Sequence, residues 1–283
     1  MTEISPIGSF SVRWGESIRW DDRRGRLYFV DCAARTLHWL DGMEPPLASL
    51  HLSSVPTGLV LADDGRVVVA LEDGLHVVDP HAERVELLTP YPEDLGERAN
   101  DANADLDGNL VTGTLNIAPG PGSYWWFSAA QGWRCLDDGI VNANGPVVLE
   151  DDGEQTLVIA DTHAGRLYAY DYDGSEGSVG ERRLFADTTE LGGMPDGACA
   201  DADGGVWSCL LGAAKIVRFT AEGAQDTIET GVAMPSDVTF GGRDLDRMMF
   251  VSIAADADAG DDGSPMSAAA TGYRGRPEPR FRL

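Results

Sequence analysis

Lysine is almost missing from this sequence, and basic residues of any kind are few. The 283 residues include 21 Lys and Arg against 47 Asp and Glu, which gives a net charge of −26 at pH 7, and Lys215 is the single lysine. A nucleic-acid-binding surface needs clustered basic side chains to neutralise phosphates. The scattered arginines form no such cluster, so nucleic acid and anionic membranes are disfavoured as partners. The acidity is compatible with high solubility or with a salty habitat.

Long apolar runs are missing as well. No stretch approaches the roughly 18 apolar residues that a membrane-spanning helix requires, and residues 1–6 lack the basic and apolar regions of a signal peptide. The cysteines show no C-x-x-C spacing, which is typical of reduced thiols in cytoplasmic proteins; they are Cys32, Cys135, Cys199 and Cys209. We therefore expect a cytoplasmic protein.

Several catalytic motifs are also absent. The sequence holds no G-x-S-x-G nucleophile elbow and no P-loop, and its five histidines form no H-E-x-x-H. Serine hydrolases of the α/β type, kinases and His-ligated zinc proteases are thereby disfavoured.

A short apolar run, an acidic-glycine turn and a second apolar run recur along the chain. In one copy, Asp64-Gly65 separates Leu59–Ala62 from Val67–Leu71, and an Asp-Gly pair between such runs is a hairpin signal. The copies, aligned on their turns, place six residues at equivalent positions, 41, 43, 44, 52 and 40 residues apart: Glu16, Thr57, Asn100, Asn144, Asp196 and Ser236. Six four-stranded units of this period predict an all-β, six-bladed β-propeller that forms a single domain over residues 1–283.

Three segments do not fit the period. The acid-rich and glycine-rich stretch Asp173–Glu190 is interpreted as a loop that absorbs the long fourth interval, and Ala254–Gly275 as a mobile surface loop. We expect the N-terminal run Ile7–Val12 to complete the last blade beside Pro279–Leu283 and so to close the ring.

The aligned positions point to a site on the axis. The first strand of each blade lines the central channel of a propeller, so the six residues should converge at one mouth. Two carboxylates, Glu16 and Asp196, would then face the amides of Asn100 and Asn144. Carboxylates packed together imply a cation or raised pKa values, and oxygen donors favour a hard or borderline divalent ion.

The same residues resemble a known family. The order and content of several short stretches are similar to the senescence-marker-protein/gluconolactonase/regucalcin family of six-bladed propeller hydrolases; they include Gly15-Glu16-Ser17, Arg98-Ala99-Asn100-Asp101, Asn144-Gly145, Pro195-Asp196-Gly197 and the C-terminal residues 278–283. The resemblance covers nearly the whole chain. Two positions depart from it: Ile18 and Ala102 stand where family members usually carry proline and glycine.

The resemblance implies hydrolysis of a sugar lactone to its aldonic acid, with one divalent metal ion (Ca²⁺, Zn²⁺, Mn²⁺, Mg²⁺ or Fe²⁺) held by Glu16, Asn144 and Asp196. Asp196 is the candidate catalytic base for water. Arg98 and Asn100 are candidates for substrate binding. Asp101 is a third such candidate, with the alternatives that it supports a neighbouring residue or caps a turn. We expect the protein to act on this small molecule as a monomer or weak dimer.

Other interpretations stay open at this point. A propeller with an oxygen-lined metal site also suits an aryl-esterase or organophosphate hydrolase of the paraoxonase type, or a calcium-binding regulatory propeller without catalysis. His163 is interpreted as a loop histidine rather than an acid or base, and Trp125 and Trp126 as a packing pair rather than a wall for sugar stacking. The acidic residues 256–262 are interpreted as solvated rather than as a calcium site.

Overall fold

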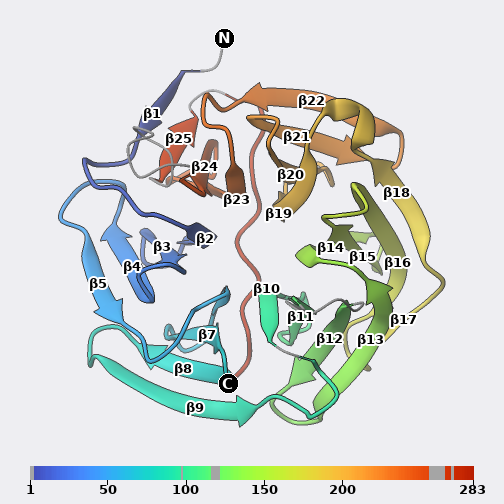
Figure 1. Cartoon of the computed structure of the whole chain (residues 1–283), viewed down its shortest axis with the longest axis horizontal. Helices are drawn as coiled ribbons and strands as arrows, with labels where there is room; N and C mark the ends of the chain where they lie inside the picture. The colour runs from blue at the N-terminus through green and yellow to red at the C-terminus, as the bar shows by residue number, and fades with distance from the viewer. Residues whose placement is uncertain (1–2, 97, 116–121, 255–264, 269–270) are drawn as a thin grey trace.

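Six small antiparallel sheets are arranged radially around a central axis in the computed structural model (Figure 1). The structure describes residues 3–96, 98–115, 122–254, 265–268 and 271–283. Apart from one 3₁₀ turn, η1 (Thr189–Leu191), the regular elements of these residues are β-strands, and no helix among them has the length and apolar character to span a bilayer. The predicted all-β, six-bladed propeller is confirmed.

Each blade begins with its first strand at the axis and proceeds outward. Blade 1 consists of β2 (Gly15–Asp21), β3 (Arg26–Asp31), β4 (Thr36–Asp41) and β5 (Ala48–His51). Blade 2 consists of β6 (Gly58–Leu61), β7 (Val67–Leu71), β8 (Gly74–Asp79) and β9 (Arg84–Pro90). Blade 3 consists of β10 (Ala99–Ala104), β11 (Leu110–Thr114), β12 (Gly122–Ser128) and β13 (Gly132–Ile140). Blade 4 consists of β14 (Ala143–Asp151), β15 (Glu154–Asp161), β16 (Arg166–Asp173), β17 (Ser178–Val179) and β18 (Arg183–Asp187). Blade 5 consists of β19 (Met194–Ala200), β20 (Val206–Leu211), β21 (Lys215–Thr220) and β22 (Gly223–Glu229). Blade 6 consists of β23 (Pro235–Gly241), β24 (Arg247–Ser252), β25 (Met266–Ala268) and β1 (Ile4–Pro6).

The hydrophobic core is divided among the blade interfaces. The described residues form six apolar clusters, one between each pair of neighbouring sheets. In the cluster between blades 1 and 2, for example, Tyr28 and Val30 pack with Leu59 and Val69. Strands that are covered on both faces need apolar residues on both faces, which explains the continuous apolar runs in the sequence.

The acidic turns after the first strands are held by their own aspartates. In blade 5, Asp201 Oδ1 accepts hydrogen bonds from the backbone N–H groups of Asp203 (3.0 Å) and Gly205 (2.8 Å). Its Oδ2 accepts from Trp207 Nε1 at 2.9 Å and from Arg218 Nε at 2.6 Å. Asp105 holds the corresponding turn of blade 3, so the recurring aspartates have a structural reason.

Two segments that were predicted as loops contain strands. Asp173–Glu190 includes β17 and β18, and β18 pairs with β16 at the outer edge of blade 4. Ala254–Gly275 includes β25, the third strand of blade 6, whereas residues 255–264, with the whole acidic cluster at 256–262, lie outside the described part of the chain. Both loop predictions are therefore wrong in part, because short apolar strands were hidden among acidic and small residues.

The ring is closed by the N-terminal strand, but not by the predicted residues. β1 (Ile4–Pro6) pairs with β25, with Ile4 opposite Ala268 and Pro6 opposite Met266. Gly8 has φ 83°, a left-handed conformation that ends the strand early. The expected strand Ile7–Val12 is instead an irregular segment whose Ile7 and Val12 side chains are buried between blades 6 and 1.

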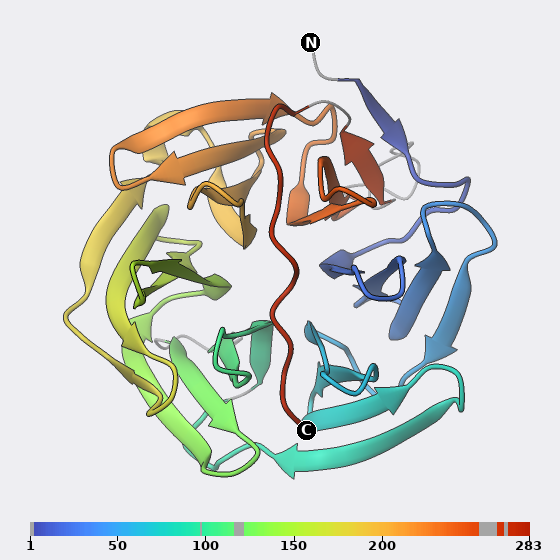
Figure 2. The same ribbon diagram turned by 180° about the vertical axis from the view of Figure 1, so that it is seen from behind.

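The C-terminal residues 271–283, which we call the strap, cross the axis at one end of the channel (Figure 2). The strap does not pair with the N-terminal run, which corrects the prediction for Pro279–Leu283. It contacts all six blades, through Arg280 with Asp21, Phe281 with Leu61, Arg282 with Gly108, Arg276 with Val148, Arg274 with Ala202, and Gly275 with Leu245. Several of these partners lie in the turns that follow the first strands, so the strap covers the end of the channel opposite the starts of those strands.

Candidate functional site at the mouth of the channel

Five of the six first strands contain a β-bulge close to the aligned position. The register shifts fall between Glu16 and Arg19, Ala99 and Ala102, Asn144 and Val147, Pro195 and Ala198, and Pro235 and Asp237. A bulge leaves a residue out of the ladder and re-aims neighbouring side chains, and such bulges are over-represented next to active sites. Ser17 (φ 49°) and Gly145 (φ 56°) adopt left-handed conformations in two of them.

Three of the six aligned side chains link one blade to the next. Thr57 Oγ1 donates to the carbonyl of Ala99 at 2.9 Å, Asn100 Nδ2 to that of Ala143 at 3.1 Å, and Ser236 Oγ to that of Gly15 at 2.6 Å. In each case the acceptor is the residue that precedes the aligned position of the next blade. The three positions without this link are Glu16, Asn144 and Asp196, the residues predicted to hold a metal.

Each of these three side chains has oxygen atoms that are not engaged by the carbonyls of the next blade. Asn144 Nδ2 donates to Thr162 Oγ1 at 2.8 Å, which leaves Oδ1 on the other side, where it accepts from Asn100 Nδ2 at 2.5 Å. Glu16 Oε1 accepts a hydrogen bond from Trp14 Nε1 at 3.0 Å, whereas no described residue donates a hydrogen bond to Glu16 Oε2. No group among the described residues donates a hydrogen bond to the Asp196 carboxylate, although this side chain is buried.

Burial and nearby negative charge raise the pKa of both Asp196 and Glu16. Burial raises the pKa of Asp196 well above its usual range, and the nearby charges of Glu16 and Asp101 add to the rise. Burial also raises the pKa of Glu16, with smaller contributions from Asp101 and Asp237, while the hydrogen bond from Trp14 opposes them. Buried carboxylates whose charged forms are destabilised by desolvation and by neighbouring negative charge favour binding of a cation.

The donor set fits a divalent metal ion. No group of three or more His, Cys, Asp and Glu side chains within the described ranges is placed to hold a metal, so the amide oxygen of Asn144 would have to complete the set with Glu16 and Asp196. Two carboxylates and an amide oxygen are ligands for Ca²⁺, Mg²⁺ or Mn²⁺, and borderline ions such as Zn²⁺ accept them too.

A buried ion network lies below these residues. Arg19 donates from Nη1 to Asp237 Oδ2 (2.6 Å) and from Nη2 to the carbonyl of Ala102 (2.9 Å), and lies 3.5 Å from Asp101 Oδ1. Asp237 Oδ2 also accepts the N–H of Ile18 at 2.8 Å, and Asp101 Oδ2 accepts the N–H of Gly145 at 3.0 Å. The network thus holds the bulges that carry Glu16 and Asn144.

One guanidinium, that of Arg19, faces two carboxylates in this network, so the charges are compensated only in part. Burial raises the pKa of Asp237 to about 7, Arg19 opposes the rise, and Asp101 adds to it. Burial likewise raises the pKa of Asp101, against the pull of Arg19 and of the Gly145 N–H. The sequence analysis missed Arg19 and Asp237. A charged residue inside an apolar first strand was the available signal for Arg19, and Asp237 was overlooked because its neighbour Ser236 occupied the aligned position.

Of the predicted substrate-binding residues, Asn100 and Arg98 lie near the mouth. Asn100 uses its Nδ2 on Asn144 and Ala143, so its Oδ1 faces no donor among the described residues. Arg98 immediately precedes β10, makes no ion pair within the described chain, and has a buried Nε without a hydrogen-bond partner. Burial raises the pKa of the Cys32 thiol, Glu16 adds to the rise and Arg98 opposes it, so both charges lie near this thiol.

Asp101 lies deeper than these two residues. Its Oδ1 accepts the N–H of Ala102 at 2.8 Å and its Oδ2 accepts the N–H of Gly145. These contacts match the alternative role in which it supports its neighbours. Direct binding of substrate by Asp101 stays a prediction.

The surroundings of His163, Trp125 and Trp126 fit the structural roles that the sequence favoured for them. His163 is exposed. Trp125 and Trp126 are buried in β12 and donate to Ser123 Oγ and Asp105 Oδ2 respectively, as a packing pair would.

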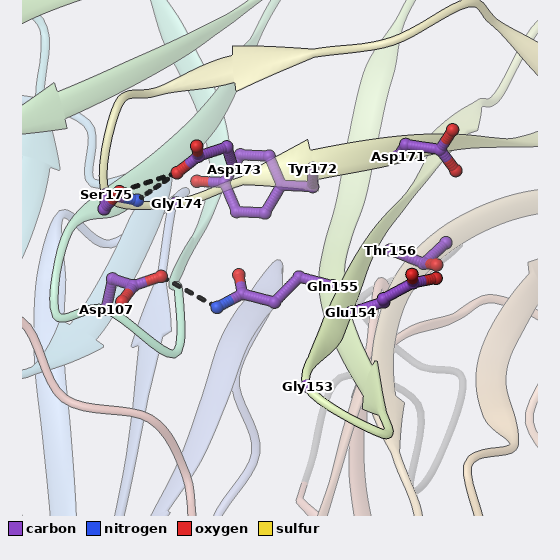
Figure 3. Close-up of a pocket in the computed structure, with 10 residues that line it drawn as sticks. All are labelled: Asp107, Gly153, Glu154, Gln155, Thr156, Asp171, Tyr172, Asp173, Gly174 and Ser175. Atoms are coloured by element: carbon purple, nitrogen blue, oxygen red, sulfur yellow. Dashed lines mark hydrogen bonds between the residues drawn. The ribbon is translucent and has the colours of Figure 1, made fainter.

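A separate hollow of about 580 Å³ lies away from the axis, against β15, β16 and the turn at Asp107 (Figure 3). Gln155 Nε2 donates to Asp107 Oδ2 at 2.8 Å in its floor, and Asp171, Asp173 and Glu154 add negative charge. It includes none of the aligned residues, and we do not place the active site there.

Known proteins resemble this chain over most of its length. The family model described as SMP-30/gluconolactonase/LRE-like region matches residues 14–254, which contain all six aligned positions. Pentonolactonase XacC of Haloferax volcanii is 28% identical, with 97% of each chain covered. A 6-deoxy-6-sulfogluconolactonase of Pseudomonas putida is 29% identical, with 84% of this chain and 82% of the relative covered.

Solved structures show the same architecture. Regucalcin of Agrobacterium tumefaciens, described as a calcium-binding protein, superposes with a TM-score of 0.90 at 24% identity, covering 100% of this chain and 98% of that one. At this identity the match shows the shared fold.

Proposed function

Because the chain belongs to the SMP-30/gluconolactonase/LRE-like family, we propose that it hydrolyses a sugar lactone to the aldonic acid at the mouth of its channel, with one divalent metal ion bound by Glu16, Asn144 and Asp196. Relatives named as lactonases support the coarser assignment, an enzyme that hydrolyses lactones. One observation supports the finer assignment, which names the metal ligands. Glu16, Asn144 and Asp196 are the three aligned residues whose side chains donate no hydrogen bond to the next blade, so their oxygens, including Asn144 Oδ1, which accepts from Asn100, are the ones that could coordinate an ion.

The chain's own residues have distinct tasks in this reaction. A bound divalent ion would supply polarisation of the lactone carbonyl and stabilisation of the charge that develops on its oxygen. Arg98 donates hydrogen bonds to substrate oxygens, and Asn100 accepts from a hydroxyl through Oδ1. Both interactions orient the ring before attack.

Asp196 is the proposed general base. It takes a proton from water as the water oxygen bonds to the carbonyl carbon. The bond between this carbon and the ring oxygen then breaks, the ring oxygen takes up a proton as the new hydroxyl, and the product is the open-chain hydroxy acid. The Asp196 carboxylate, which no described donor occupies, is suited to this transfer.

We also propose the domain organisation, oligomeric state, partners and cellular location of the enzyme. Residues 1–283 act as one domain, as a monomer or weak dimer, without nucleic acid or membrane partners. Four free cysteines, three of them buried, support a location in the cytoplasm.

The test is hydrolysis of five-membered and six-membered aldonolactones by chelator-stripped protein, followed with a pH indicator, with each divalent metal restored in turn. We expect activity to depend on metal and to fall at least about 100-fold in Glu16→Gln and Asp196→Asn, because each loses a charged ligand and Asp196→Asn also loses the base. Glu229→Gln on the outer strand β22 is the matched control and should be unchanged.

Two outcomes would contradict the proposal. Hydrolysis of aryl esters or phosphotriesters in preference to every lactone would establish the esterase alternative. Stoichiometric binding of calcium without turnover of any substrate would establish a regulatory propeller instead.

A further inference from the structure

The residues two positions before the aligned set form a second ring at the mouth. They are, in blade order, Trp14, Val55, Arg98, Asn142, Met194 and Met234. In four blades the backbone confirms that these positions are equivalent, because their carbonyls accept the N–H that follows the second strand: Trp14 from Cys32, Arg98 from Leu115, Asn142 from Thr162, and Met234 from Ile253. In blade 5, Met194 pairs with Leu211 at the end of β20.

This outer ring is divided into two arcs. Blades 3 and 4, which are neighbours, supply the polar side chains of Arg98 and Asn142. The other four blades follow one another around the axis and supply apolar side chains, namely Met194, Met234, Trp14 and Val55. We call these the polar arc and the apolar arc.

The apolar arc is exposed where it borders the carboxylates. Trp14 is 38% exposed and Met194 is 39% exposed. Of the other large exposed hydrophobics among the described residues, Leu87 and Leu184 lie on outer strands, Leu283 ends the strap, and Val141 precedes Asn142 in blade 4. Side chains two residues apart on a regular strand point to the same side, and the bulge of β2 lies after Glu16, so Trp14 accompanies Glu16. Met194 directly precedes the bulge that carries Asp196. The hydrogen bond from Trp14 Nε1 to Glu16 Oε1, 3.0 Å long, holds the indole at the site.

An apolar surface beside a polar centre discriminates between the edges of a substrate. A hydroxyl pressed against Trp14 or Met194 would lose its hydrogen bonds to water without replacement, which is unfavourable. A C–H group or a methyl group gains from the same contact. The polar arc offers the guanidinium of Arg98 and the amide of Asn142 to oxygens.

We propose that the mouth selects a sugar lactone with one deoxygenated edge, which lies on the apolar arc while the hydroxylated edge lies on the polar arc. This inference rests on the proposed function and names the substrate class for the same site.

The test compares one aldonolactone with its series of single-deoxy analogues in the metal-restored protein. We expect at least one deoxy analogue to be hydrolysed with a kcat/KM about tenfold higher than that of the parent, since apolar contacts of this size change specificity by such factors. The near-isosteric variant Met194→Gln, combined with Met234→Gln, should abolish that advantage. Trp14→Phe, which keeps an apolar ring, should retain it, and Leu184→Gln on β18 is the surface control.

A second measurement does not depend on turnover. Trp14 is the one exposed tryptophan among the described residues, so acrylamide should quench its fluorescence selectively. The deoxy aldonate product should protect that fluorescence, and the protected component should be missing in Trp14→Phe.

The outcomes distinguish a failure of the apolar-arc inference from a failure of the lactonase proposal. If the wild-type protein hydrolyses lactones but every deoxy analogue is a poorer substrate, or if Met194→Gln/Met234→Gln leaves the preference unchanged, the apolar-arc inference is overturned and the lactonase stands. If no lactone is hydrolysed under any metal, the lactonase proposal falls and this inference falls with it.

Discussion

At the scale of single residues, Asn100 and Asn144 show how one residue type acquires two roles at equivalent positions. Asn144 Nδ2 finds an acceptor within its own blade, Thr162 Oγ1, whereas the residue equivalent to Thr162 in blade 3 is Leu115, which has no hydroxyl. Asn100 therefore donates to the next blade and Asn144 does not. The threonine determines that Asn144 Oδ1 faces the axis.

This argument predicts the effect of Thr162→Val. The valine keeps the shape of the side chain but removes the acceptor, so Asn144 loses the contact that orients its amide. We expect metal affinity, measured by titration calorimetry, to fall by about 10–100-fold, the usual effect of removing a partner that orients a ligand. Thr230→Val, the same change at a buried threonine that follows the outermost strand of blade 5 and bonds the Val232 carbonyl, should leave the affinity unchanged. Equal affinities in the two variants would show that Thr162 does not orient Asn144.

At the scale of elements, the aspartate of the first hairpin turn supplies stability that depends on pH. Burial raises the pKa of Asp201, but the hydrogen bonds from Arg218 and from the Gly205 N–H outweigh burial, and the pKa is lowered overall. A lowered pKa means that the charged form stabilises the fold above the pKa of the unfolded chain, about 3.9 for aspartate. This contribution is lost as the pH falls through the folded value.

Asp201→Asn should therefore destabilise the protein at neutral pH and much less in acid. We expect a loss of about 3 kcal/mol in the free energy of unfolding at pH 7, because Arg218 loses its buried partner. The difference from wild type should shrink as the pH falls below about 4, where the wild-type carboxylate takes up its proton. Denaturant titrations across this range provide the measurement, with Asp203→Asn in the same turn as control. A difference that stays constant with pH would refute the assignment.

The hairpin turns also explain which elements could be predicted from sequence. Asp-Gly pairs between apolar runs are local signals, and they located four first strands with the aligned positions Thr57, Asn100, Asn144 and Asp196. The first and sixth units, with Glu16 and Ser236, lack the pair and were placed by the period of the repeat. The strands β18 and β25 carried no such signal, because their partners are distant or separated by long insertions. The ion network of Arg19 was equally hidden, since its partners Asp101 and Asp237 are 82 and 218 residues away.

At the scale of the whole molecule, the ring is fastened in two ways. β1 completes blade 6 at the rim, and the strap crosses the axis and contacts every blade. The strap also covers the far end of the channel, so a small molecule would have to approach Glu16 and Asp196 from the opposite end. Because the six apolar clusters lie between blades, the stability of each blade depends on its neighbours.

Phe281 is the apolar anchor of the strap. Its side chain is fully buried, its ring lies 5.8 Å from that of Phe127 in blade 3, and its backbone N–H donates to the Leu61 carbonyl of blade 2 at 2.9 Å. Phe281→Ala should lower the free energy of unfolding by about 3–5 kcal/mol through the cavity that it leaves, which corresponds to a fall in Tm of roughly 5–10 °C.

Calorimetry of Phe281→Ala also tests whether the chain is a single domain. If the interfaces between blades and the strap make residues 1–283 one cooperative unit, wild type and variant will each unfold in one transition, and Leu283→Ala at the exposed end of the strap will match wild type. Two separated transitions in the wild-type protein would show that groups of blades unfold independently. An unchanged Tm in Phe281→Ala would show that the strap contributes nothing to closing the ring, and that the pairing of β1 with β25 is sufficient.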